Sequence, residues 1–119
     1  MADHNNTFGF ERLDVYRLAR EALVDILEHK AKLRGLPGEI PSQLERAAVA
    51  TVALIAEASG RQGRADQRNR FAMARAEANE AAAMIELAQL YGIFTDDNHA
   101  KLRSLYLSVT RMLTALINR

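Results

Sequence analysis

The chain has 119 residues, a formal net charge of +1 at pH 7 and no cysteine. A chain of this length is expected to form one domain, residues 1–119, and the absence of thiols excludes thiolate catalysis, cysteine-ligated zinc and disulfide bonds. The uncharged run 47–56 is too short to span a bilayer, and the N-terminal residues lack a basic segment followed by an apolar one. We therefore expect a cytoplasmic protein with no membrane partner.

Abundant alanine, an aromatic content of only 6% and the lack of alternating β-branched residues predict an all-α fold. The first helix is predicted over residues 10–33. The positions that recur every three or four residues are Leu13, Tyr16, Ala19, Leu23, Ile26 and Lys30. This is the period of one buried helix face. Gly35 can adopt the left-handed cap conformation, and Pro37 and Pro41 cannot lie inside a helix, so the helix should end here.

The second helix, residues 42–59, is predicted to lie at the centre of the packing. Ser42 and Glu45 have the spacing of a capping box, and Ser59-Gly60 marks the end. One face should be formed by Leu44, Ala48, Thr51, Ile55 and Ala58. Because residues 47–56 carry no charge, we expect a second subunit to cover the helix as well. The residues predicted for this oligomer interface are Val49, Val52, Ala53, Leu54 and Ala56.

The third helix is predicted over residues 65–91 and is rich in alanine. Its inward face should contain Phe71, Ala74, Ala78, Ala81, Ile85 and Ala88. Small side chains on that face allow a neighbouring helix to approach closely. Glu77 lies near the apolar face, so it should pair with a basic residue such as Arg46 or point into a subunit contact. Gly92 should end the helix.

The fourth helix, residues 96–118, should begin after Thr95, which can cap it. Its repeating apolar positions are Leu102, Leu105, Val109, Met112 and Leu116, with Tyr106, Leu113 and Ile117 beside them. Short connections between the four predicted helices indicate an antiparallel up-down-up-down four-helix bundle.

No motif in the chain identifies a reaction. Di-iron bundles need Glu-x-x-His pairs, which are missing here, and the closest arrangements are Asp25 with His29 and the segment Asp96–His99. The serines lie in caps, turns or helix surfaces and match no nucleophile motif. We therefore expect no enzymatic activity, no metal, no cofactor and no small-molecule substrate.

Arginines are concentrated between residues 61 and 75. They are Arg61, Arg64, Arg68, Arg70 and Arg75. On an ideal helix Arg64, Arg68 and Arg75 project within about 40° of one another, a stripe that could contact phosphates of RNA or DNA. The alternative is a solvated or ion-paired face, since acidic residues follow on the same helix.

Several segments together resemble one bacterial family. These are Phe10–Tyr16 with Ala19, then Gln43, Arg46–Val49, Ile55–Glu57 and Gly60-Arg61. They are similar to the four-helix-bundle family of ribosomal RNA intervening-sequence proteins. The resemblance implies a ring-shaped homopentamer. It also extends to the accessory variability determinant of diversity-generating retroelements, which binds a reverse transcriptase and nucleic acid.

The central helix departs from that family's pattern. The family usually has a serine, a proline and an asparagine where this chain has Ala50, Val52 and Leu54, and Ala58 replaces a glycine. These changes make the helix more apolar. Our first hypothesis is thus a non-enzymatic oligomeric helical scaffold or adaptor that binds itself. The alternative is a nucleic-acid-binding ring that contacts RNA or DNA through the arginine stripe.

Overall fold

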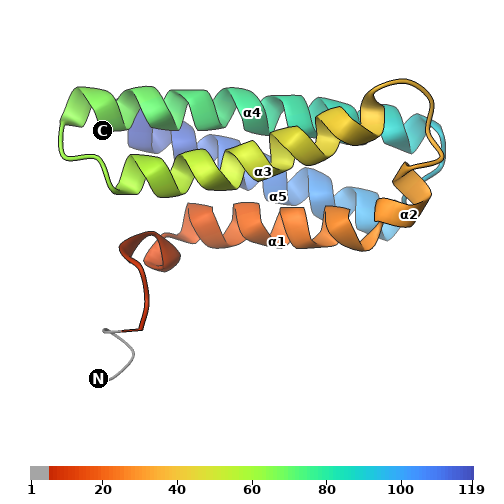
Figure 1. Cartoon of the computed structure of the whole chain (residues 1–119), viewed down its shortest axis with the longest axis horizontal. Helices are drawn as coiled ribbons and strands as arrows, with labels where there is room; N and C mark the ends of the chain where they lie inside the picture. The colour runs from red at the N-terminus through yellow and green to blue at the C-terminus, as the bar shows by residue number, and fades with distance from the viewer. Residues whose placement is uncertain (1–5) are drawn as a thin grey trace.

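The computed structural model describes residues 6–119, and the described part of the chain is an all-helical bundle without a strand (Figure 1). The predicted all-α class is therefore confirmed. The elements are the 3-10 helix η2 (Gly9–Arg12) and the α-helices α1 (Asp14–Glu28), α2 (Lys30–Leu33), α3 (Ile40–Ser59), α4 (Arg64–Leu90) and α5 (Asp96–Asn118). No helix in this range is long and apolar enough to cross a membrane.

The prediction of a single helix over residues 10–33 is wrong, because the helical segment is interrupted at two places. Leu13 is extended, with φ −78° and ψ 128°, and separates η2 from α1. At the second break, His29 Nδ1 lies 2.8 Å from the Asp25 carbonyl oxygen, and the His29 amide donates to the Ile26 carbonyl instead. The imidazole therefore competes with the backbone for the Asp25 carbonyl at the place where α1 ends.

The buried face of α1 is also rotated from the predicted one. Its apolar members are Val15, Ala19, Ala22 and Ile26. The predicted positions Leu13, Tyr16 and Leu23 are only partly buried, and Lys30 is exposed.

Helix α3 begins two residues before the predicted start, and the predicted capping box is absent. Pro41 lies in the first turn, where a missing amide proton has no cost, and the Ser42 hydroxyl donates to the Glu39 carbonyl at 3.1 Å. The left-handed glycine of the preceding loop is Gly38, with φ 66°, and Gly35 does not adopt that conformation. The ends of α4 differ from the prediction by one residue each.

The predicted inward faces of α3 and α4 are confirmed. All of their members are at most 2% exposed: Leu44, Ala48, Thr51, Ile55 and Ala58 on α3, and Phe71, Ala74, Ala78, Ala81, Ile85 and Ala88 on α4. The buried Thr51 hydroxyl donates to the Ala47 carbonyl at 2.8 Å, so it adds no unsatisfied polar group. Four alanines on the α4 face leave room for the β-branched and larger side chains of the neighbouring helices.

The predicted start of α5 is confirmed, because Thr95 Oγ1 accepts the Asn98 amide at 3.1 Å. Gly92 has φ 74° after the end of α4, and the following Phe94 is buried. The buried residues of α5 are Leu102, Leu105, Tyr106, Val109 and Leu113, whereas Met112, Leu116 and Ile117 are only partly buried.

Candidate functional site

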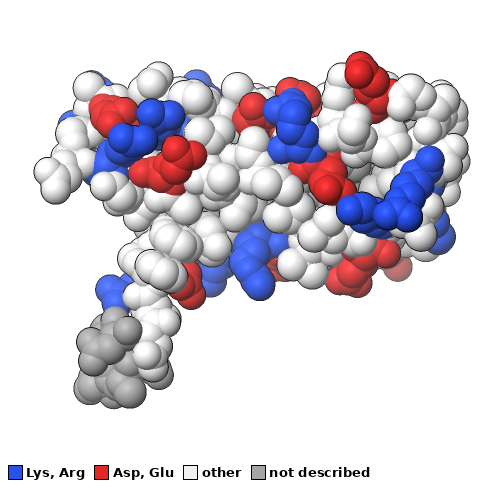
Figure 2. All heavy atoms as spheres, in the orientation of Figure 1, with Lys and Arg blue, Asp and Glu red and all other residues white. Residues whose placement is uncertain are grey.

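An apolar groove, here called the α3 groove, lies between the first half of α3 and the corner formed by α1 and α2. Its volume is about 710 Å³, and its apolar lining includes Ile26, Leu33 and Val49. Val49 is 46% exposed. Figure 2 shows side chains of both charges close together on this part of the surface, with uncharged surface between and around them. The α3 groove is therefore an apolar surface that the chain itself leaves partly uncovered.

The predicted interface residues do not form one face of α3. Val49 lines the groove and Ala53 is exposed, whereas Val52, Leu54 and Ala56 are partly buried. Val52 and Leu54 pack against the core of their own chain. The single chain thus covers part of the predicted interface and leaves Val49 and Ala53 exposed.

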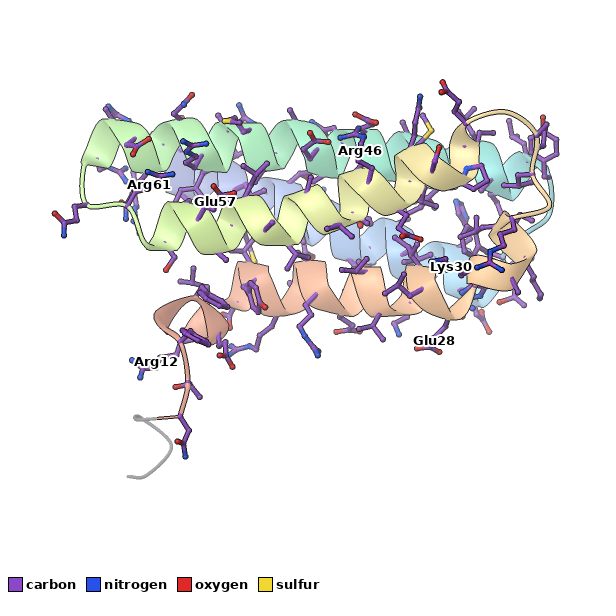
Figure 3. All side chains as sticks on the ribbon, in the orientation of Figure 1. Arg12, Glu28, Lys30, Arg46, Glu57 and Arg61 are labelled. Atoms are coloured by element: carbon purple, nitrogen blue, oxygen red, sulfur yellow. The ribbon has the colours of Figure 1, made fainter. Side chains whose placement is uncertain are left out.

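Paired charges border the α3 groove. The Lys30 amine lies 3.2 Å from the Glu45 carboxylate. Arg46 pairs with Glu77 at 3.2 Å and with Glu80, as the prediction for Glu77 anticipated (Figure 3). The hydrogen bond to Glu80 and the charge of Glu77 raise the pKa of Arg46 above its ordinary value. An apolar centre with a charged rim is the common anatomy of a protein interface.

The five predicted arginines fall into two groups. Arg61 and Arg70 lie 3.7 and 3.8 Å from the Asp66 carboxylate, and Arg61 also lies 3.9 Å from Glu57. Arg61 and Glu57 are neighbours near the turn between α3 and α4 (Figure 3). Acidic groups therefore neutralise two of the five predicted positive charges.

The other three arginines lie on the side of α4 that faces α5. Arg64 donates to the Leu116 carbonyl at 3.4 Å and also to the Arg119 carbonyl. Burial lowers the pKa of Arg64, and the positive charges of Arg119 and Arg68 lower it further. Arg75 donates to Thr114 Oγ1 at 3.1 Å. Within residues 6–119, Arg68 has no hydrogen bond or ion pair, so it is the freest of the five.

A second groove, here called the α4–α5 groove, lies beside Arg75 and was not predicted. Its lining consists of Arg75, Asn79, Thr110, Arg111 and Thr114, and its volume is about 370 Å³. Arg111 was missed because a single sequence does not show which residues of α5 lie opposite Arg75. The repeat of Thr110 and Thr114 on the helix face next to Arg111 was the available signal.

A polar cluster at the α1–α2 break was also only partly anticipated. His29 Nδ1 donates to the Asp25 carbonyl, which leaves Nε2 to accept from Asn98 Nδ2 at 2.8 Å. The His29 ring packs against Phe94 at 5.0 Å. In the described range no group of three or more His, Cys, Asp or Glu side chains is placed to hold a metal ion. The cluster therefore ties the helix break to the start of α5.

The described residues form a small helical-bundle protein whose surface includes an apolar groove and an arginine-lined groove. The chain belongs to the 23S rRNA-intervening sequence protein family, whose family model matches residues 11–115. It is similar to the crystal structure of a protein of unknown function from the S23 ribosomal protein family of Bacteroides thetaiotaomicron VPI-5482. The TM-score is 0.79 at 24% identity, with 88% of this chain and 99% of that chain covered. At this identity the likeness shows the fold alone. No curated protein matches the chain.

Proposed function

We propose that the protein is a non-enzymatic, cytoplasmic, oligomeric scaffold or adaptor whose subunits associate through the α3 groove. The proposal includes an antiparallel arrangement of the four longer helices and a homopentameric ring, which the family resemblance implies. The observation that supports it is the exposure of Val49, at 46%, within the ten uncharged residues of α3. A second copy is the occupant that we infer for this groove.

The charges around the groove are compatible with another subunit as the occupant. Lys30 with Glu45, and Arg46 with Glu77 and Glu80, form a rim that contains both signs. In a closed ring each contact joins two different surfaces of neighbouring subunits, so this rim would meet another part of the next copy, where charges of either sign can pair with it. The apolar centre then supplies the burial that drives association.

The test compares Val49→Glu with Val24→Glu. Val24 lies on α1 and is 41% exposed, so the two substitutions place a new carboxylate at valines of nearly equal exposure. An unpaired charge in a dry contact costs several kcal/mol, so only Val49→Glu should dissociate the oligomer. Light scattering coupled to size exclusion should give the wild type and Val24→Glu a multiple of the 13.3 kDa chain mass, and Val49→Glu a smaller mass. A wild-type protein of 13.3 kDa would refute the proposal.

A second candidate function is contact with RNA or DNA phosphates through the α4 arginines. It is favoured by Arg68, which is exposed and free of partners within the described residues, and by the resemblance to the nucleic-acid-binding accessory determinant. The affinities of the wild type and of Arg68→Ala for labelled RNA and DNA should be measured at several salt concentrations. Arg61→Ala is the matched control, because Arg61 is already paired with Asp66. Equal affinities of the wild type and Arg68→Ala at every salt concentration would exclude this candidate.

A further inference from the structure

We propose that the α4–α5 groove binds a phosphate group between the guanidinium groups of Arg75 and Arg111. The groove shares no lining residue with the α3 groove, so the inference goes beyond the proposed self-association. Its volume of about 370 Å³ exceeds that of a phosphate group, so part of the ester that carries the phosphate also fits. The ligand class is therefore a phosphate monoester or a phosphodiester.

Arg75 is held in place by neutral groups alone. Its Nη1 donates to Thr114 Oγ1 at 3.1 Å. The Thr114 hydroxyl donates to the Thr110 carbonyl at 2.9 Å, which leaves its oxygen free to accept from Arg75. The Thr110 hydroxyl in turn donates to the Tyr106 carbonyl at 2.9 Å. Arg75 is thus positioned without a carboxylate, and its other N–H groups remain available to a ligand.

Arg111 supplies the second positive charge from α5. It is exposed, and it makes no hydrogen bond or ion pair with any other described residue. The groove lining contains these two arginines, two threonines and Asn79, but no acidic residue. Two guanidinium groups beside one open groove repel each other, and a phosphate placed between them removes that repulsion. Arginine presents paired N–H groups that match phosphate oxygens.

The nearby carboxylates of α4 are already engaged elsewhere. Asp66 lies between Arg61 and Arg70, while Glu77 and Glu80 pair with Arg46. These ion pairs keep the acids away from the α4–α5 groove. The groove is therefore a place where positive charge is left without a carboxylate among the described residues.

The positive charge continues from the groove toward the start of α4. Arg68 lies seven residues before Arg75, about 10.5 Å along the helix and about 20° around it. Arg64 follows on the same side, and the charges of Arg119 and Arg68 contribute to the lowered pKa of Arg64. A phosphodiester chain anchored in the groove would meet these arginines next, whereas a single phosphate ester would use the groove alone.

The first experiment titrates inorganic phosphate into the intact protein and follows the arginine side-chain and backbone signals by NMR. The variants are Arg111→Ala, which removes one charge, and Arg75→Lys, which keeps the charge but loses the paired donors. Arg20→Ala is the control, since Arg20 is exposed on α1 and has no partner among the described residues. We expect Arg111→Ala and Arg75→Lys to weaken phosphate binding about tenfold, and Arg20→Ala to leave it unchanged.

The second experiment identifies the source of the phosphate with a single-stranded oligonucleotide. A loss of oligonucleotide affinity in Arg111→Ala, with a smaller salt dependence, assigns the site to a nucleic-acid backbone. Weaker inorganic phosphate binding with unchanged oligonucleotide affinity assigns it to small phosphate esters. Equal phosphate binding by the wild type, Arg111→Ala and Arg20→Ala overturns the proposal. That failure leaves the scaffold proposal standing, because the oligomer mass is measured separately with the α3 variants.

Discussion

Replacing Ala78 by leucine tests whether small side chains set the distance between α4 and its neighbours. Ala78 is completely buried, on the same face as Ala74 and Ala81. Leucine adds three carbon atoms at a position where the alanine side chain is already fully covered. Leucine and alanine have similar helix propensities, so the substitution changes packing and leaves the helical preference of the segment almost unaltered.

The expected loss of stability in Ala78→Leu follows from the complete burial of Ala78. Overpacking a filled core costs about 1–3 kcal/mol, since neighbouring side chains leave their preferred rotamers or the helices separate. An unfolding entropy of about 2.1 cal/mol/K per residue gives about 0.25 kcal/mol/K for 119 residues. The melting temperature should therefore fall by about 4–12 °C.

Ala76→Leu is the matched control, because Ala76 is exposed on the same helix. Surface substitutions of this kind change stability by no more than about 0.5 kcal/mol, or about 2 °C here. Thermal unfolding should be followed by circular dichroism at two protein concentrations, so that any contribution of association is visible. Equal melting temperatures for the two variants would show that the α4 face has room for larger side chains, and the packing argument would then be wrong.

Two further substitutions test single groups on α5. Thr95→Ala removes the acceptor of the Asn98 amide and should cost about 1 kcal/mol, measured as a lower urea midpoint; an unchanged midpoint would show that the cap is not needed. Tyr106→Phe removes a buried hydroxyl that has no hydrogen-bond partner in the described structure, so stability at pH 7 should be equal or higher. Burial raises the pKa of Tyr106 above its ordinary value, so the neutral form is favoured in the folded state and stability is lost as the pH rises beyond about 10. Tyr106→Phe should show less of this alkaline loss in urea unfolding between pH 7 and 11, and an identical pH dependence would contradict the assignment.

The sequence predicted the buried faces of α3 and α4, with only Ala47 missed, because these helices face the core along most of their length. A repeat of three and four is then visible without knowing the neighbours. The prediction failed at the α1–α2 break, where His29 competes for the Asp25 carbonyl. That competition depends on Asn98 and Phe94, which hold the imidazole from the far end of the chain. A local pattern contains no information about such a long-range contact.

The arginine stripe shows the same limit for function. Helical spacing placed Arg64, Arg68 and Arg75 on one side of α4, and the structure places Arg64 and Arg75 against α5. Spacing did not reveal that Asp66 lies close to both Arg61 and Arg70. Nor did it reveal that Arg111 would complete a groove with Arg75, because the register between two helices is set by the packing of whole faces. The positive charge available to a ligand therefore depends on which arginines have no carboxylate beside them in the folded chain. The net charge of the sequence segment overestimates this available charge.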